Sequence, residues 1–290
     1  MVPDKHPDFP GDQPMIKTIQ QYVRSMHASP GLTSHACYTC ALLLLAVSAQ
    51  VQSAVWDPRE IEVLNIVNLQ RGFHSLNSLN ADDRLHAAAL GHSQSMSSNN
   101  FFSHTTLSGP GIGSQPAGRI AAAGYDLSPP SASGENIAAG QGYLLGATLT
   151  QMTALDAARD VMYGTTVLSE LSDFFGVAFS SWEMVGSSQS DADWSSWDQG
   201  WMGSNGHRHN ILNSLFNDLG VGYVWEPDDT APIALDNGQS VNIPFRTYWT
   251  QNFAAGDTQV VPLPAGVWLF VSALLGMAAV RRGARRHAPT

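Results

Sequence analysis

The sequence predicts an α+β domain, because helical patterns fill the first part of its central region and strand patterns fill the last part. This central region, residues 55–256, is long enough to bury one core. Hydrophobic residues make up 43% of the 290 and charged residues only 13%, which excludes a charge-rich disordered chain. We therefore expect one folded domain with a shorter segment at each end.

Apolar residues at helical spacing predict most of the helices. The expected helices cover residues 60–71, 81–98, 119–123, 146–162, 166–175 and 201–215. Asn80 is expected to cap the second of them. Segment 108–133 is rich in Gly, Pro and Ser, so we expect it to be mostly loop. Segment 187–198 is rich in Ser and Asp and predicts a mobile or ligand-facing loop.

Three strand candidates follow the last helix. They are residues 220–225, 232–235 and 241–252. Asp236, Asn237 and Gly238 form a hairpin signal between the last two, because Asn-Gly favours the tight turn that joins antiparallel strands. Helices first and an antiparallel meander last are the order of an α+β domain.

The charges exclude one class of partner. The net charge is −10, from 14 Lys and Arg against 24 Asp and Glu. The middle of the chain is more acidic still, since residues 55–260 hold 7 Arg and no Lys against 21 Asp and Glu. Phosphate backbones bind to basic surfaces, so we expect no nucleic-acid partner. The ends are basic, which indicates that they have a different role from the body.

The N-terminal segment, residues 1–54, predicts a secretory signal. An apolar run that begins at Cys40 is followed by small residues, and cleavage after Ala49 or after Ala54 fits this pattern. The run is too short to span a bilayer, and the alternative is a buried core helix. Cys37 and Cys40 are the only cysteines and would leave with the signal, so we expect no disulfide in the exported body.

The C-terminal segment, residues 257–290, has three parts in order. They are a Val-Pro-Leu-Pro-Ala motif at 261–265, an uncharged stretch to Val280 and an arginine cluster at 281–286. This tail resembles the VPLPA variant of the PEP-CTERM sorting signals, which exosortases of Gram-negative bacteria recognise. The resemblance implies a transmembrane helix that holds the protein transiently in the inner membrane, then processing by an exosortase-type enzyme and delivery to the cell surface or extracellular matrix. The alternative is a plain single-helix anchor.

Short clusters across the body follow one order. They are Asn68-Leu69-Gln70-Arg71, His92-Ser93-Gln94-Ser95-Met96, Asn100-Phe101-Phe102-Ser103-His104, Arg119 with Ala123-Gly124-Tyr125, Gly134-Glu135-Asn136-Ile137-Ala138, Trp201 to Arg208 with Asn210-Ile211-Leu212, Gly220-Val221-Gly222, and Tyr248 to Phe253. Together they resemble bacterial members of the CAP (SCP) superfamily, the cysteine-rich secretory and pathogenesis-related proteins, over residues 60–253. The resemblance implies a three-layer α-β-α sandwich with a central cleft.

The resemblance also implies which side chains meet in the cleft. The two cleft histidines match His104 and His207. One acid matches Glu135, whereas Ser204 stands where the second acid usually lies. Two imidazoles and a carboxylate suit Zn²⁺ or another divalent cation; the alternative is that the carboxylate only hydrogen-bonds an imidazole and holds the cleft together. The residues expected to support the cleft are Asn136, Trp201 and Ser204.

A catalytic interpretation uses the same region. Ser204, His207 and Glu135 contain the residue types of a nucleophile, a base and an orienting acid, and positions i and i+3 share a helix face. The flanking sequence lacks the GxSxG turn that exposes a nucleophilic serine. We therefore expect a binding role, with a lipid, polysaccharide or protein ligand, rather than catalysis. A hydrolase that acts on peptide or cell-wall bonds is the alternative.

Residues 142–198 are predicted to form an inserted helical segment, since compact bacterial members of the family have far fewer residues between the Gly-Glu-Asn motif and the next cleft motif. We expect the insertion to form a lid or wall over the cleft. Trp194 and Trp197 within it either stack on sugar rings or anchor the insertion to the core. Of the other histidines, His92 is expected in the core and His86 at the surface.

Overall fold

The computed structural model describes residues 54–164 and 167–256. The predicted signal region, apart from Ala54, and the predicted sorting tail lie outside these residues. No helix in the described part of the chain is long and apolar enough to cross a membrane.

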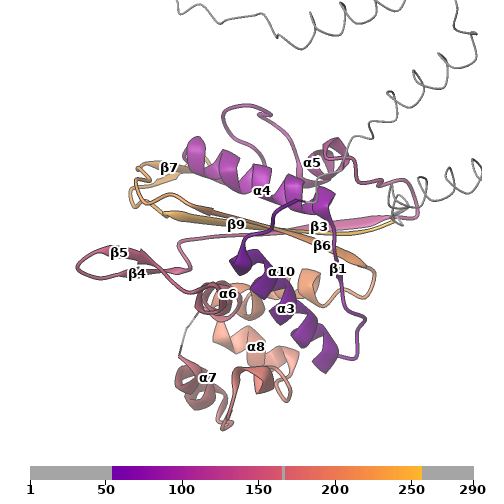
Figure 1. Ribbon diagram of the computed structural model, residues 1–290, viewed down its shortest axis with the longest axis vertical. Helices are drawn as coiled ribbons and strands as arrows, with labels where there is room; N and C mark the ends of the chain where they lie inside the picture. Colours follow the sequence, from indigo (N-terminus) through magenta and orange to yellow (C-terminus); the bar gives the residue numbers. More distant parts are fainter. Residues whose placement is uncertain (1–53, 165–166, 257–290) are drawn as a thin grey trace, which may run out of the picture. The chain divides into compact units, whose positions relative to one another are not determined.

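The architecture is the predicted one, an α+β fold in three layers (Figure 1). The middle layer is a sheet with the strand order β1-β6-β9-β3. Its strands are β1 (Asn80–Ala81), β6 (Asp218–Trp225), β9 (Thr247–Ala255) and β3 (Ala132–Ala139). β9 pairs antiparallel with both β6 and β3, and β1 pairs parallel with β6. β3 therefore lies at one edge of the sheet.

One face of the sheet is covered by α4 (Asp83–Ser98) and α5 (Pro116–Ala122) (Figure 1). α4 packs directly on β6, because Gly220 and Gly222 have no side chains and a Cβ at either position would collide with the α4 backbone. This close approach is the physical reason for the Gly-Val-Gly motif.

The start of α4 corrects one sequence expectation. Asp82 caps this helix, since its side chain accepts from the backbone N–H groups of Arg84 and Leu85. Asn80, which the sequence predicts as the cap, lies in β1 instead and pairs with Asp218 of β6. Asn80 cannot cap α4, because its backbone is paired in the sheet, and the helix therefore begins after Asp82.

The opposite face is covered by helices from three parts of the chain (Figure 1). They are α3 (Pro58–Phe73), α6 (Ala154–Tyr163), α9 (Gly200–Gly203) and α10 (Asn205–Ile211). The main hydrophobic core lies between this layer and the sheet. α3 begins with a capping box of Asp57 and Glu60. The helix predicted over 201–215 is broken at Ser204, whose extended backbone separates α9 from α10.

The insertion adds a hairpin and further helices on the same side as α3 (Figure 1). These are β4 (Tyr143–Leu145), β5 (Leu149–Gln151), α7 (Leu168–Phe175), the 3₁₀ helix η1 (Trp182–Met184) and α8 (Asp191–Trp197). The helix predicted over 146–162 is wrong in its first part, which pairs in the hairpin, and α6 begins only after its cap, Thr153. The loop predicted over 187–198 is also wrong, because Trp194 and Trp197 are buried and α8 forms around them.

A small second sheet fixes the chain immediately before His104. It consists of β2 (Phe101–Phe102), β7 (Ile233–Leu235) and β8 (Ser240–Val241). β7 and β8 form the predicted hairpin, with Gly238 at a φ of 75°. The single strand predicted over 241–252 is wrong, because the chain divides there between β8 and β9, which belong to different sheets. β2 pairs with β7 and ends immediately before Ser103 and His104. This pairing fixes where the site loop begins.

Candidate functional site

The site is built around β3, the edge strand that carries the Gly-Glu-Asn motif. Glu135 and Asn136 are neighbours in this strand, so their side chains point to opposite faces of the sheet. Glu135 lies opposite Asn252 of β9, and Asn136 lies opposite Gln251. The motif thus supplies one polar pair to the face covered by α4 and α5, and another to the face covered by α10.

The carboxylate of Glu135 is surrounded by donors on the first face. The Glu135 side chain is 1% exposed. Its Oε1 lies 2.9 Å from Nδ1 of His104, and its Oε2 lies 2.7 Å from Nη2 of Arg119. With its amide nitrogen turned towards the carboxylate, Asn252 donates to Oε2 at 3.1 Å, and its oxygen accepts from the Ala89 N–H. These partners offset the cost of burying an anion.

Arg119 is quoted among the family's motifs above, but it was not assigned to the site from the sequence. It comes from α5, and besides Glu135 its Nη2 reaches the carbonyl oxygen of His104 at 2.9 Å. Its Nη1 donates to the carbonyl oxygen of Ser114 at 2.8 Å. One guanidinium therefore holds the loop from His104 to Ser114 and the carboxylate together. The available signal was that Arg119 is the single arginine in the Gly-, Pro- and Ser-rich segment 108–133.

On the opposite face, a chain of amides joins β3 to α10. The Asn136 amide donates to the carbonyl oxygen of His207 at 3.1 Å and to Oε1 of Gln251 at 2.9 Å. The Asn210 amide donates to Oδ1 of Asn136 at 2.9 Å and to the carbonyl oxygen of Glu135 at 3.2 Å. These bonds hold α10, and with it His207, against the edge strand.

Trp201 and Ser204, which the resemblance places beside the cleft, differ in their contacts. Trp201 is buried, and its Nε1 donates to the carbonyl oxygen of Ile137 in β3 at 3.2 Å. Ser204 lies at the N-terminus of α10, and within the described ranges no hydrogen bond joins its hydroxyl to His207. Glu135 bonds to the imidazole of His104 instead. The contacts described therefore do not join Ser204, His207 and Glu135 into a catalytic chain.

Two histidines near the site are held in the neutral form. Burial, and to a smaller extent the charge of His104, lower the pKa of His207 from 6.5 to about 4. Burial also lowers the pKa of His92 to about 4, although the charge of Glu135 acts in the opposite direction. Both rings are therefore uncharged at neutral pH.

The contacts of Glu135 bear on the predicted metal site of His104, Glu135 and His207. In the part of the chain that the structure describes, no three His, Cys, Asp or Glu side chains are grouped to hold one. Both oxygens of Glu135 have donors, and the adjacent Arg119 repels a cation. The imidazole of His104, 43% exposed, directs Nε2 away from Glu135, and His207 is neutral. Glu135 lies behind His104 as the group that orients its ring.

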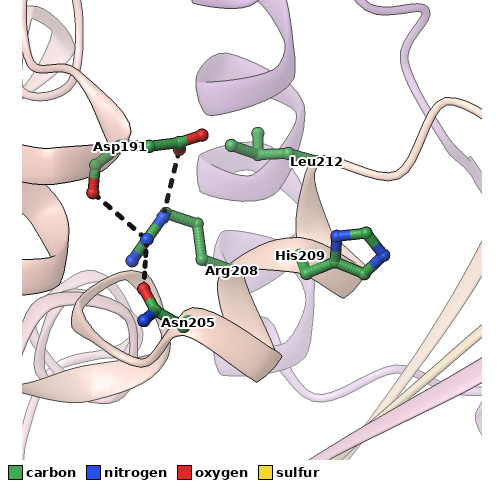
Figure 2. Close-up of a pocket in the computed structure, with 5 residues that line it drawn as sticks. All are labelled: Asp191, Asn205, Arg208, His209 and Leu212. Atoms are coloured by element: carbon green, nitrogen blue, oxygen red, sulfur yellow. Dashed lines mark hydrogen bonds and ion pairs between the residues drawn. The ribbon is translucent and has the colours of Figure 1, made fainter.

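A separate pocket lies on another face of α10, against the insertion (Figure 2). It has a volume of about 240 Å³ and is lined by Asp191, Asn205, Arg208, His209 and Leu212. Arg208 is buried and bonds to Asp191 of α8 and to Asn205, whereas the His209 ring points away from it (Figure 2). Arg208 ties the insertion to the helix that carries His207. The insertion lies on the α10 side of the sheet, and its role as a wall of the cleft stays a prediction.

Several solved structures are similar to this chain. One is an extracellular protein with an SCP domain from Bacillus anthracis, with 25% sequence identity and a TM-score of 0.38. An outer surface protein from Borrelia burgdorferi has 14% identity and a TM-score of 0.37. A cysteine-rich secretory protein from Staphylococcus aureus has 13% identity and a TM-score of 0.33.

The extent of these matches differs between the proteins. They cover 68%, 69% and 68% of this chain in the same order. This chain spans only 40% of the Bacillus protein and 39% of the Staphylococcus protein, but 93% of the Borrelia protein. No curated protein sequence matches the chain.

The sequence profile of the cysteine-rich secretory protein family, CAP, matches residues 64–253. This range contains β3, β6 and most of β9, and the side chains of His104, Glu135 and His207. It covers well over half of the 290 residues. This chain belongs to the cysteine-rich secretory protein (CAP) family.

Proposed function

We propose that this protein is exported and binds a ligand, without catalysis, at a cleft where His104 and His207 hold a divalent cation. The observation that carries the proposal is the chain of contacts from Arg119 through Glu135 to Nδ1 of His104. It directs Nε2 of His104 away from the buried carboxylate, and burial keeps a second imidazole, that of His207, neutral. Neutral imidazole nitrogens are the commonest metal ligands in proteins.

The cation that fits this donor set is Zn²⁺ or another divalent ion that accepts imidazole ligands. Glu135 orients the His104 ring, as carboxylates commonly do behind a metal-bound histidine. When bound, the ion supplies a Lewis-acidic centre that takes an oxygen or nitrogen of the ligand. Asn136 and Asn210 hold α10 in place, so that His207 keeps its position when a ligand enters.

The charges of the body narrow the class of ligand. Every arginine of the described residues bonds to an acceptor within the protein; these are Arg59, Arg71, Arg84, Arg119, Arg159, Arg208 and Arg246. Acidic groups outnumber them, so the surface offers few cations to a polyanion. An uncharged lipid, an uncharged polysaccharide or a protein therefore fits better than nucleic acid or an anionic polymer.

The two ends of the chain support a location outside the cytoplasm. The signal predicted over 1–54 indicates export, and the sorting tail predicted over 257–290 indicates transient anchoring in the inner membrane. An exosortase-type enzyme would then process the tail. The binding domain would act at the cell surface or in the extracellular matrix.

Titration of the full-length chain with Zn²⁺ tests the proposal. We expect one ion per chain at neutral pH, removed by a chelator. His104→Ala and His207→Ala should each strongly weaken binding, because each removes one of the two protein ligands. His209→Ala is the matched control, since His209 lies on the same helix among the residues that line the pocket around Arg208, with its ring turned away from Arg208 (Figure 2). Equal Zn²⁺ affinity in all four proteins would show that the cleft is not the metal site.

The hydrolase alternative predicts a different result for Glu135→Ala. An enzyme that uses this carboxylate loses turnover of a peptide or cell-wall substrate while it still binds that substrate. A metal-dependent binding protein loses metal and ligand affinity together. Lipids, polysaccharides and peptides are therefore offered to the wild type and the variant, and turnover of any of them by the wild type favours the hydrolase.

A further inference from the structure

A second pocket lies where α3, α6 and the 3₁₀ helix η1 meet, and it shares no lining residue with the cleft. Its volume is about 310 Å³. Four side chains form its apolar wall, namely Ile66, Leu69, Leu155 and Trp182. Ligand pockets in proteins begin at about 300 Å³, so this one fits a small molecule with a short apolar chain.

The walls of this pocket are held in place by contacts behind them. The guanidinium carbon of Arg159 lies 4.6 Å from the ring centroid of Trp182, and Tyr163 stacks on the same ring with centroids 5.8 Å apart. The Gln70 amide donates to the Tyr163 hydroxyl at 2.9 Å and to the carbonyl oxygen of Val185 at 2.7 Å. These contacts fix the chain around η1 against α3 and α6, so a ligand does not have to order the walls.

The charged groups around the pocket are mostly acidic. Glu62 and Glu183 line it. Among the described residues that line the pocket, Arg159 is the only cation, and its Nη1 lies 3.4 Å from Oδ1 of Asp156. Three carboxylates thus accompany one guanidinium, and this excess of negative charge attracts a cation.

We propose that this pocket binds a small amphiphilic cation, an organic molecule with an alkyl chain of a few carbons and one ammonium group. The chain leaves water along the apolar wall, and the ammonium group lies beside the two lining carboxylates. α3 supplies Glu62, whereas the insertion supplies Trp182 and Glu183, so the site depends on the packing of the insertion against α3. This binding activity is separate from the proposed function of the cleft.

A series of ligands offered to the full-length chain at neutral pH and low ionic strength tests the proposal. Ethyl-, butyl- and hexylammonium are titrated while the assigned indole N–H signal of Trp182 is followed by nitrogen-15 spectra. We expect affinity to rise about fourfold for each methylene that becomes buried. Hexanol and hexanoate carry the same chain without the cation and should bind more weakly. A hexylammonium affinity no higher than that of ethylammonium or hexanol overturns the proposal.

Variants of the lining residues separate the two parts of the site. Glu62→Gln combined with Glu183→Gln keeps the shape but removes both charges, so hexylammonium binding should weaken about 2- to 25-fold, as for two exposed ion pairs, while hexanol binding stays the same. Leu155→Ser should instead reduce the dependence on chain length. Glu170→Gln is the matched control, because Glu170 is exposed on α7 and does not line the pocket.

Unchanged hexylammonium affinity in the double Gln variant, or an equal loss in Glu170→Gln, contradicts the proposal. The ligand series needs only the wild type, so it remains decisive if a variant does not fold. His104→Ala and His207→Ala should leave hexylammonium affinity at the wild-type value, since neither residue lines this pocket. Loss of Zn²⁺ binding in the same two variants therefore tests the proposed function separately.

Discussion

At the scale of single residues, the buried side chain of His92 holds the backbone just before His104. Its Nε2 lies 2.9 Å from the carbonyl oxygen of Ser103, and its buried Nδ1 has no partner among the residues described. Burial is the main reason that its pKa falls from 6.5 to about 4. The folded protein thus holds His92 neutral, as a donor to the residue that precedes His104.

The pKa of His92 predicts how stability depends on pH. It is about 4 in the folded protein, against 6.5 for an unperturbed histidine. As the pH falls below 6.5, the unfolded chain takes up a proton that the folded chain rejects, so the free energy of unfolding decreases until the pH reaches about 4. The contribution lost over this range approaches about 3 kcal/mol.

Urea unfolding across this pH range measures the effect. His92→Gln should lower stability at neutral pH but show a shallower decrease as the pH falls. His209→Gln, which changes an exposed histidine, should keep the slope of the wild type. A His92→Gln slope equal to that of the wild type would contradict the prediction.

His86 is a residue for which the expected surface position is wrong. It is 3% exposed, and its Nε2 lies 2.9 Å from Oε2 of Glu60. Oε1 of Glu60 accepts from the Tyr223 N–H at 2.8 Å, and Trp56 stacks on the His86 ring with centroids 4.6 Å apart. The pattern of apolar residues in α4 could not reveal this, because the partners that make burial of His86 favourable come from α3 and β6.

At the scale of elements, α8 is anchored to the body by aromatic contacts. Trp194 is fully buried and stacks on Tyr163, with ring centroids 5.7 Å apart. Its ring also packs edge-to-face with that of Phe175, with centroids 4.9 Å apart. Trp197 donates from Nε1 to the carbonyl oxygen of Tyr163. Of the two roles that the sequence leaves open for Trp194, anchoring agrees with this burial, since stacking on a sugar requires an accessible ring face.

Trp194→Ala should therefore destabilise the protein by about 3 to 5 kcal/mol, the range for removing a large aromatic side chain from a core. Phe174→Ala is a suitable control, because Phe174 belongs to the same aromatic region but is 46% exposed. Its cost should be clearly smaller. Urea unfolding of both variants gives the comparison, and equal costs, or a negligible effect of Trp194→Ala, would show that α8 is not held by this ring.

Elements with strong periodicity were predictable, and those without it were not. α3 and α4 form close to the ranges predicted from apolar spacing, since each buries one stripe of side chains. β3 was not predicted as a strand, because residues 132–139 are mostly small or polar and carry little strand preference of their own. They become a strand through eight paired positions with β9.

At the scale of the whole molecule, the charges are distributed unevenly between interior and surface. The arginines of the described residues all bond to acceptors within the protein, while many carboxylates remain exposed, among them Glu170, Asp173, Glu183, Asp193 and Asp228. Like charges on a compact surface repel one another and weaken the folded state. The fold tolerates this because its core does not depend on surface ion pairs.

Salt should therefore stabilise the protein. Screening shortens the range of repulsion from about 30 Å at 0.01 M to about 3 Å at 1 M ionic strength. We expect Tm to rise with NaCl, most steeply at low concentration. Sucrose at matched osmolality does not screen charge and should give a smaller rise over the same range. A Tm that falls with added NaCl would contradict the distribution of charges described here.

The sequence by itself determined the α+β class, the order of the family's motifs, most helices of the body, and His104, Glu135 and His207 as the residues of interest. These features depend on the spacing of residues along the sequence, which does not depend on tertiary contacts. Only the tertiary structure decided that Glu135 bonds to His104 and Arg119, while Asn136 faces α10. The reason is physical: a buried carboxylate takes the donors that strand register and loop packing bring within 3 Å, and those donors lie 16 and 31 positions away along the chain.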